Sequence, residues 1–385
     1  MFYNEFKGLQ LSALGFGAMR LPVTEDGKTV DKALTAAMFD SAIRAGVNYF
    51  DTAVPYHYGT SEPVVGEILR RYPRDSWYLA SKYPGHQHYP VFDPQGTFEN
   101  SLSKCGVDYF DFYLFHNVCE NDIADYLDPR WDILGYFVEQ RKKGRIRHLG
   151  MSSHASLQGL REILDGPYGR EIEFCQIQLN YLDWTLQEAR EKVALLNERR
   201  IPIWVMEPLR GGKLAAVPEV TVDEAFRWIA DVPGVKVILS GMSAPEQVEQ
   251  NLATFSEHRP LSAEDRARLL QVAETLKKGV PCTGCRYCCD GCPMGLDIPA
   301  LLKTYNDLSY SVDFCPTMFI DSLPEDKRPS ACVGCGQCSS VCPQGIDIPG
   351  SLDALDGLLA KAPKWADVCR RRHALEAAER AAQKK

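Results

Sequence analysis

The chain has 385 residues, 45% of them apolar, which is enough for one large hydrophobic core and a small second domain. Its formal net charge of −8 argues against nucleic acid or an anionic membrane surface as a partner. No segment approaches the ~20 apolar residues of a membrane span, and charges interrupt the N-terminal MFYNEFKGLQ where a signal peptide needs an apolar stretch. We therefore expect a soluble, cytoplasmic protein.

In chain order, a hairpin is expected at Phe2–Ser12, and then short apolar runs alternate with segments of helical spacing. Each run is almost continuously apolar, as is typical of a parallel strand buried on both faces. The predicted strands are Leu14–Met19, Val47–Ala53, Trp77–Tyr83, Tyr109–His116, His148–Ser153, Phe174–Asn180, Ile201–Pro208 and Val235–Met242. Helices between them include Lys32–Ala45, Ser61–Arg71 and Leu186–Arg199.

Eight β-then-α units in about 250 residues predict an α/β fold, the (β/α)₈ TIM barrel. An open, doubly wound sheet is the alternative, but it rarely needs eight units. A further helix at Ala263–Lys277 follows the last unit, and the composition then changes abruptly to CTGCRYCCDGCP. We therefore assign residues 1–277 to the barrel and 278–385 to a small, mostly helical domain. Its last stretch, about Leu352–Gln383, is rich in Ala, Leu, Arg and Glu and should form a C-terminal helix.

Ten of the 14 cysteines fall between Cys282 and Cys342, mostly in two runs with the spacing C-x₂-C-x₂-C-x₃-C-P. This is the spacing of bacterial ferredoxins with two [4Fe–4S] clusters, in which the fourth cysteine of each run binds the other cluster. Cluster one is therefore assigned to Cys282, Cys285, Cys288 and Cys342, and cluster two to Cys332, Cys335, Cys338 and Cys292. Two zinc sites are the alternative, but zinc usually shows paired C-x₂-C knuckles.

The two runs continue alike, as GLDIP at residues 295–299 and GIDIP at 345–349. This internal duplication predicts a helix starting at each proline. The long segment between the runs resembles the helical dicluster ferredoxin modules that are fused to larger enzymes. Cys289 and Cys315 fit neither run, and we treat both as non-ligands.

Four polar residues stand at the carboxyl ends of predicted strands, where (β/α)₈ barrels place their active sites. Asp51 and Tyr56 lie in FDTAVPY after the second strand. Lys82 ends the third strand in LASKY, and His116 ends the fourth in FYLFH.

With these residues, the motifs LGFGAMRLP, FDTAVPYHYG, LASKY, DYFDFYLFH, GMSSH and PEQVEQN resemble the aldo-keto reductase superfamily over nearly all of the first 260 residues. Asp51, Tyr56, Lys82 and His116 match the family's catalytic tetrad. The resemblance implies that Tyr56 is the general acid, or the base in the reverse direction. The Lys82 charge would lower the pKa of Tyr56, Asp51 would hold Lys82, and neutral His116 would orient the substrate carbonyl.

The resemblance also implies NAD(P)H bound across the barrel mouth. The positions matching the carboxamide contacts are Ser152, Ser153 and Gln176. The loop expected at the pyrophosphate is Pro208, Leu209, Arg210, Gly211, Gly212 and Lys213, and the positions expected at the adenosine end are Gly241, Met242, Ser243, Gln247, Gln250 and Asn251. Three positions depart from the family: an Asn is common at Ser153, a stacking aromatic at Met206, and an Arg for the 2′-phosphate at Gln247.

The leading hypothesis is an NAD(P)-linked oxidoreductase that interconverts a small-molecule carbonyl and an alcohol and carries two [4Fe–4S] clusters. A hydride carries two electrons whereas each cluster accepts one. The first alternative is therefore a flavin-containing enzyme that exchanges electrons with a ferredoxin-like partner through the clusters. The second is a non-catalytic subunit of a redox complex.

Overall fold

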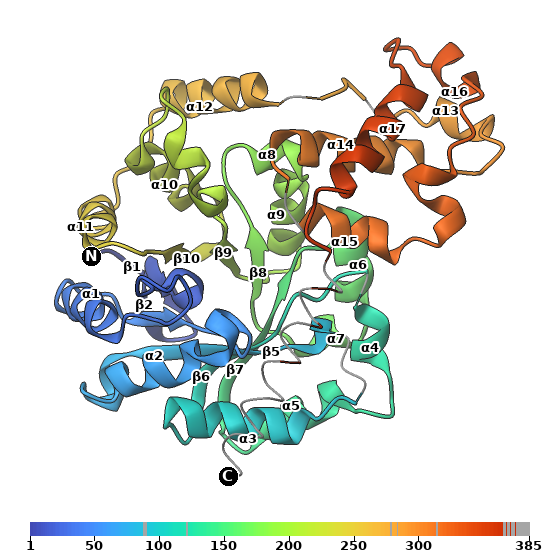
Figure 1. Cartoon of the computed structure of the whole chain (residues 1–385). Coiled ribbons are helices and arrows are strands. Elements are labelled where there is room, and N and C mark those ends of the chain that lie inside the picture. Colours follow the sequence, from blue (N-terminus) through green and yellow to red (C-terminus); the bar gives the residue numbers. More distant parts are fainter. Residues whose placement is uncertain are drawn as a thin grey trace.

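A computed structural model describes residues 1–87, 91–120, 122–277, 279–282, 284–312 and 315–364, with Asp367, Arg370 and Ala374. It confirms the predicted barrel, since eight parallel strands close in the order β10-β3-β4-β5-β6-β7-β8-β9 (Figure 1). The strands are β3 (Leu14–Gly17), β4 (Tyr49–Asp51), β5 (Tyr78–Tyr83), β6 (Phe110–Phe115), β7 (Ile146–Ser153), β8 (Cys175–Gln178), β9 (Ile203–Met206) and β10 (Val235–Gly241). Each overlaps one predicted run, because continuous apolar sequence suits strands buried on both faces.

The predicted N-terminal hairpin is also present, and it plugs the amino-terminal end of the barrel. Strands β1 (Tyr3–Phe6) and β2 (Leu9–Ser12) pair antiparallel. The Phe6 ring packs edge-on against Trp204 at 5.1 Å between centroids and at 5.9 Å from Phe112, both inside the barrel. The barrel interior at this end is therefore filled with aromatic side chains.

Helices surround the barrel. They are α1 (Lys32–Arg44), α2 (Ser61–Leu69), α3 (Pro94–Cys105), α4 (Ile123–Leu127), α5 (Ile133–Lys142), α6 (Leu157–Asp165), α7 (Pro167–Glu171), α8 (Asp183–Leu186), α9 (Ala189–Glu198), α10 (Val222–Ala230), α11 (Pro245–Thr254) and α12 (Ala263–Leu276). Short 3₁₀ turns are η1 (Ala18–Arg20), η2 (Tyr56–Gly59), η3 (Arg74–Ser76), η4 (Gly85–Gln87), η5 (Arg210–Gly212) and η6 (Leu214–Ala216).

One helix of the barrel differs from the sequence prediction. The segment Leu186–Arg199 is not continuous, because α8 ends at Leu186 and α9 starts only at Ala189. Glu188 between them has φ +54°, a left-handed conformation that interrupts a right-handed helix.

The remaining described chain, which we call the C-terminal region (residues 279–364), has its own hydrophobic core. Its helices are α13 (Tyr287–Asp290), α14 (Ile298–Tyr310), α15 (Cys315–Ser322), α16 (Gln337–Ser340) and α17 (Ile348–Leu359), with turns η7 (Glu325–Lys327) and η8 (Pro329–Ala331). The duplication in sequence is a duplication in structure. Both α14 and α17 start beside the predicted proline and are capped by an aspartate, Asp297 and Asp347.

The predicted terminal helix Leu352–Gln383 is wrong in its limits. Helix α17 starts at Ile348 and ends at Leu359, and a turn follows at residues 360–362 before Pro363. A proline has no backbone N–H and disfavours helix at the residue before it, so the helix stops there despite the favourable composition. Most of the predicted segment beyond residue 364 lies outside the described residues.

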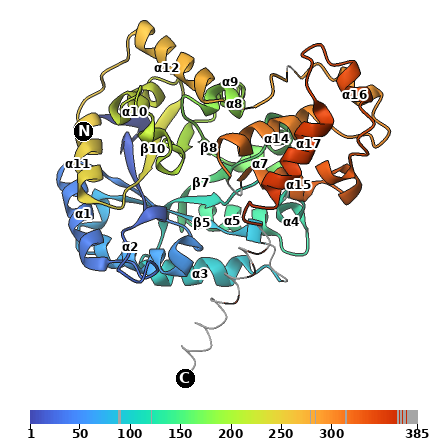
Figure 2. The ribbon, with the colours of Figure 1, turned by 45° about the horizontal axis from the view of Figure 1, so that its top comes forward.

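The C-terminal region sits over the carboxyl ends of the barrel strands. Met318 of α15 is buried in the barrel core cluster, where Asn117, just after β6, donates a hydrogen bond from Nδ2 to its sulfur at 3.3 Å. Lys303 of α14 forms an ion pair with Glu188, which follows β8. Figures 1 and 2 both show α14 beside α8, with the orange and red C-terminal region projecting from one side of the barrel.

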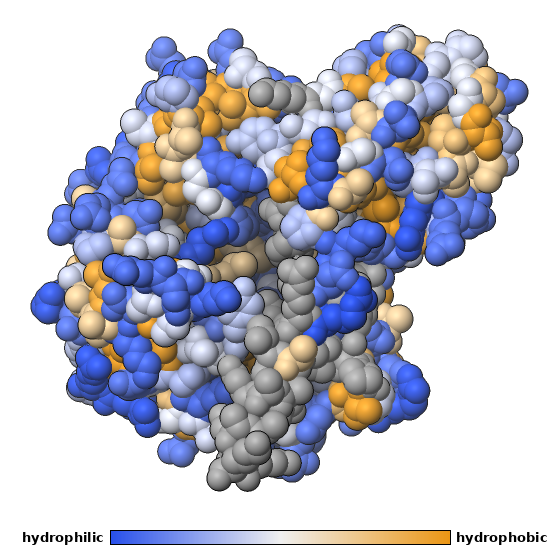
Figure 3. All heavy atoms as spheres, viewed as in Figure 1, coloured by the Kyte–Doolittle hydropathy of each residue, from blue (hydrophilic) through white to orange (hydrophobic). Residues whose placement is uncertain are grey.

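The visible surface is largely hydrophilic, with hydrophobic residues in small groups (Figure 3). Among the residues that the structure describes, no helix has both the length and the apolar composition needed to cross a membrane.

Packing around Gly66 in α2 gives a test of the fold. A Cβ atom there would collide with the backbone carbonyl of Cys105 at the end of α3, whereas nothing lies within 4 Å of a Cβ at Gly357 in α17. We expect Gly66→Ala to lower the unfolding free energy by about 1–3 kcal/mol, because backbone must move. Gly357→Ala should raise it by up to about 1 kcal/mol through helix propensity. Urea unfolding followed by circular dichroism measures both, and equal effects would contradict the α2–α3 packing.

Candidate active site and cysteine sites

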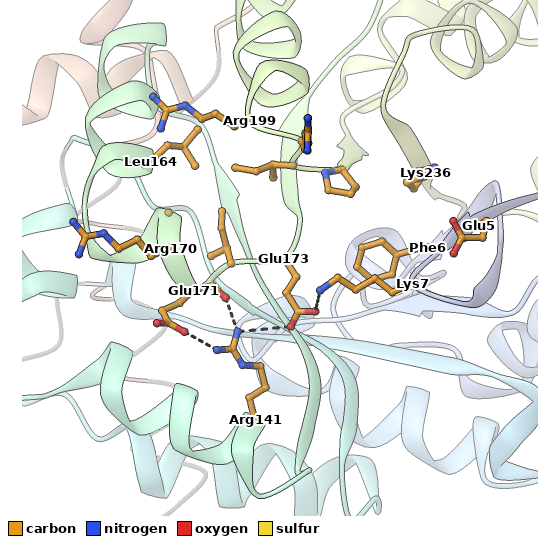
Figure 4. A pocket seen from close by; sticks show the side chains of 15 residues that line it. Glu5, Phe6, Lys7, Arg141, Leu164, Arg170, Glu171, Glu173, Arg199 and Lys236 are labelled. Carbon is orange, nitrogen blue, oxygen red and sulfur yellow. Dashed lines mark hydrogen bonds and ion pairs between the residues drawn. The ribbon is translucent and has the colours of Figure 1, made fainter.

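In the part of the chain that the structure describes, cavities open at opposite ends of the barrel. The one at the amino-terminal end, about 1040 Å³, is lined by the β1–β2 turn and by the segments that enter β8 and β9 (Figure 4). Ion pairs hold its wall together: Arg141 contacts Glu171 at 2.6 Å and Lys7 contacts Glu173 at 2.5 Å. It is remote from the predicted tetrad, which lies at the carboxyl end, where barrels of this kind place their chemistry.

The carboxyl end is organised around the fully buried side chain of Lys82 on β5. Its Nζ donates to Asp51 Oδ1 at 2.5 Å, to the backbone oxygen of Thr52 at 2.8 Å and to Tyr56 Oη at 3.3 Å. Since β4 and β5 are neighbours in the sheet, the carboxyl end of β4 brings Asp51 beside Lys82. A buried ammonium requires such partners, because removal from water otherwise costs several kcal/mol.

The environment sets the protonation of this group of residues. Burial raises the pKa of Tyr56, and the nearby Lys82 charge only partly offsets this. For Lys82 burial lowers the pKa, but Asp51 and Tyr56 together outweigh burial and leave it raised. Lys82 does pull the pKa of Tyr56 down, as expected from the sequence. Burial has the larger effect, however, so the pKa of Tyr56 is raised and not lowered. At neutral pH the phenol stays protonated beside a charged lysine.

His116, which directly follows β6, completes the group. Its ring lies edge-on to Tyr56, with 5.8 Å between ring centroids, and 4.5 Å from the ring of His86. Tyr126 donates a hydrogen bond to the backbone oxygen of His116 at 2.6 Å and so fixes this turn. The structure therefore brings all four sequence-predicted tetrad positions together.

A cavity of about 340 Å³ opens above Asp51 and Tyr56. Its lining includes ten of the positions expected at a nucleotide: Gln176, Pro208, Leu209, Gly211, Gly212, Gly241, Ser243, Gln247, Gln250 and Asn251. Five other predicted positions do not line it: Ser152, Ser153, Arg210, Lys213 and Met242. Ser152 accepts a hydrogen bond from the backbone of Asn117, Ser153 donates to the oxygen of Val118, Lys213 contacts Ser311, and Met242 is buried.

The lining has the features that an extended dinucleotide needs. Gln176 is buried, and its Oε1 atom has no hydrogen-bond partner among the described residues, so it can accept one from a carboxamide. Gly211 and Gly212 have φ +66° and +92°, which lets the backbone approach a phosphate without a side chain in the way.

Two charged residues of this cavity were missed in the sequence. Arg20 of η1 and Glu207 after β9 both line it and face each other at 3.7 Å. Arg20 stands in LGFGAMRLP, just past the first barrel strand, and a charged residue at a strand's carboxyl end is the signal that could have identified it.

The cysteines of the C-terminal region line two small pockets. One contains Cys282, Cys285, Cys288 and Cys342, and the other contains Cys292, Cys332, Cys335 and Cys338. Each pocket thus combines three cysteines of one run with the fourth of the other, the grouping assigned from the sequence. The other walls are mostly apolar, including Leu302 and Ile346 at the first pocket. Four thiols around an apolar space fit a [4Fe–4S] cluster, which binds one thiolate at each iron.

Left-handed turns shape both cysteine loops in the same way. Gly284 and Gly334, which precede the second cysteine of each run, have φ +72° and +67°. Only glycine adopts this conformation without strain, so the duplicated glycines fix the course of the duplicated loops.

The aldo/keto reductase family model matches residues 13–224, more than half of the chain. The chain belongs to this family. A 4Fe-4S dicluster domain model matches residues 281–346 of the same aldo-keto reductase. The recognition of both parts from the sequence is thereby confirmed.

Relatives of this aldo-keto reductase align with about two thirds of this chain. An NADH-specific methylglyoxal reductase of Escherichia coli is 26% identical over 65% of this chain and 90% of its own length. An L-galactose dehydrogenase of Arabidopsis thaliana is 25% identical over 70% and 92%. Among solved structures, the holo form of an aldo-keto reductase from Bacillus halodurans matches with a TM-score of 0.58 at 24% identity, covering 71% of this chain and 96% of that one. A Klebsiella pneumoniae aldo/keto reductase in complex with NADP and acetate matches with a TM-score of 0.55 at 22% identity, covering 69% of this chain and 93% of that one. These two structural likenesses concern the fold alone.

The buried ion pair gives a test of the site. Lys82→Met leaves the Asp51 carboxylate buried without its partner, and we expect a loss of about 3–5 kcal/mol of unfolding free energy. The double variant Asp51→Leu/Lys82→Met removes both charges and should be less destabilised than the single variant. Urea unfolding at neutral pH compares the two. A double variant at least as unstable as the single one would contradict the account of a compensated buried charge.

Proposed function

We propose that this aldo-keto reductase interconverts a carbonyl and an alcohol with NAD(P)H and carries two [4Fe–4S] clusters. The observation that carries the proposal is the buried Lys82 ammonium, which contacts both Asp51 and Tyr56 at the base of the cavity. The phenol of Tyr56 reaches this cavity, so a carbonyl oxygen placed there can receive its proton.

Bound NAD(P)H would supply the hydride. Tyr56 would donate its proton to the oxygen that becomes the hydroxyl, and Lys82 at 3.3 Å would stabilise the phenolate left behind. Asp51 keeps the ammonium in place at 2.5 Å. His116, edge-on to Tyr56, would limit how the carbonyl lies against the phenol. The Gln176 oxygen would accept from the carboxamide and orient the ring.

The lining and the relatives support a nucleotide preference and a first substrate to test. Gln247 carries no positive charge for a 2′-phosphate, which favours NADH, the cofactor in the name of the Escherichia coli relative. Methylglyoxal, named for the same relative, is the first of a panel of small carbonyls to test.

Replacing the proton donor tests the reaction. Tyr56→Phe removes only the phenol oxygen, and we expect kcat/KM for carbonyl reduction to fall by about 10²- to 10⁴-fold. Tyr58→Phe is the matched control, because Tyr58 is 51% exposed on the same turn and does not line the cavity. The assay follows oxidation of NADH and NADPH with methylglyoxal and other small carbonyls. Retained turnover in Tyr56→Phe would remove the tyrosine from the mechanism.

The two cysteine pockets support a cluster at each. An optical spectrum with and without NADH or NADPH would report whether the nicotinamide reduces them. Flavin released by acid denaturation would instead favour the alternative of a flavin that divides the two electrons of a hydride, with a ferredoxin-like partner receiving them.

Paired substitutions test the crossed assignment. If Cys285 and Cys342 bind the same cluster, Cys285→Ala/Cys342→Ala should lose only that cluster and keep about four of about eight irons. Cys335→Ala/Cys342→Ala removes one ligand from each cluster, and this variant should keep almost no iron. Iron and acid-labile sulfide are measured on anaerobically purified protein. Cys289→Ala is the control and should keep all the iron, since Cys289 lines neither pocket. Uncrossed binding would reverse the results of the two double variants.

A further inference from the structure

The loop between β9 and α10 forms the wall of the nucleotide cavity in an unfavourable backbone conformation. Glu207 and Arg210 have φ +52° and +46°, in the left-handed region that non-glycine residues seldom occupy. Such residues persist only where the surroundings hold them in place. The contacts that hold this loop are therefore part of what builds the cavity.

Arg210 provides the contacts that hold the loop. It does not line the cavity as the sequence suggested; its side chain is only 8% exposed and points out of the loop. Its Nε contacts the fully buried carboxylate of Asp183 at 3.1 Å. Asn180 then links Asp183 back to the loop, because its Nδ2 donates to Asp183 and to the backbone oxygen of Glu207.

The other side of Arg210 meets the C-terminal region. Its Nη2 lies 3.8 Å from Oδ1 of Asp307 on α14, and its guanidinium lies 5.1 Å from the ring centre of Tyr310 on the same helix. Lys213, at the end of the loop, contacts Ser311, just after α14. The guanidinium is thus clamped between a carboxylate of the barrel and one of the C-terminal region, with an aromatic ring beside it.

We propose that Arg210 is a positioning residue that fastens the nucleotide-binding loop to α14, so that the dicluster domain completes the nucleotide site of the barrel. This deepens the proposed function and rests on it only where nucleotide binding is measured. A barrel without this domain would lack one of the two carboxylates that hold the strained loop.

The first test needs no nucleotide. Asp307→Asn keeps the shape of the side chain and removes its charge. Asp111→Asn is the matched control: Asp111 is a buried barrel aspartate that contacts Arg74 at 2.6 Å and Arg147 at 3.2 Å. Burial raises the pKa of Asp307 to about 7 against the pull of Arg210, so the experiments run at about pH 8, where it is ionised.

Hydrogen–deuterium exchange of the peptide spanning residues 207–217 is compared in full-length, cluster-loaded proteins. The amides of Arg210, Gly212, Lys213 and Leu214 are hydrogen-bonded within the loop and report its opening. We expect exchange about tenfold faster in Asp307→Asn and unchanged in Asp111→Asn. If the peptide exchanges in Asp307→Asn at the same rate as in the wild type, the proposal is overturned. If that variant does not fold, Arg210→Lys, which keeps the charge without the planar fork, must show the same loosening.

The second test uses NADH and NADPH as probes. Asp307→Asn should raise the dissociation constant and KM of the nucleotide about tenfold with kcat nearly unchanged. If the substitution only reduced the fraction of folded protein, the apparent kcat would fall, because less of the enzyme would be active. Asp111→Asn should then show the same fall. Nucleotide affinity unchanged in Asp307→Asn would overturn the inference. If the wild type binds neither nucleotide, the nicotinamide proposal fails while the exchange result still decides the role of the clamp.

Discussion

A positive charge enclosed by a barrel is the constraint on which the active site depends. Lys82 has no access to water, so Asp51, the carbonyl of Thr52 and the phenol of Tyr56 must replace its hydration. The closed parallel sheet makes this possible because it brings the carboxyl ends of β4, β5 and β6 together. Stability and the proposed chemistry are thus linked, since the groups that compensate the charge include Tyr56, the proposed proton donor.

The parts that could be predicted from the sequence are those in which local pattern and global structure agree. Continuous apolar runs gave the eight strands, because burial on both faces leaves no polar positions. Cysteine spacing gave the grouping around the two pockets, since the loops of each run are short and turn at Gly284 and Gly334. The tetrad positions could be predicted because each of them ends or follows a strand of a closed barrel.

Other features depend on contacts between distant segments, which spacing does not encode. The break at Glu188 coincides with its ion pair to Lys303 of α14, more than a hundred residues away. Arg210 sits in a glycine-rich loop that suggests a phosphate contact, yet its side chain turns toward Asp183 and Asp307. The raised pKa of Tyr56 likewise reflects the burial that the assembled barrel imposes rather than the neighbouring charge alone.

Helix α14 connects the two predicted redox sites. Pro299 and Leu302, in its first turns, line the pocket of Cys282, and Tyr310 at its end lies beside Arg210. At 1.5 Å per residue, Leu302 and Tyr310 are about 12 Å apart along the helix axis. The helix that lines a cysteine pocket with its first turns therefore also contacts, at its end, the loop that carries Arg210. The neighbouring helix α15 adds a second contact at the barrel mouth, where Met318 packs against Asn117 next to His116. In this chain the C-terminal region thus contacts two segments beside the candidate site, the loop that carries Arg210 and the turn that carries Asn117.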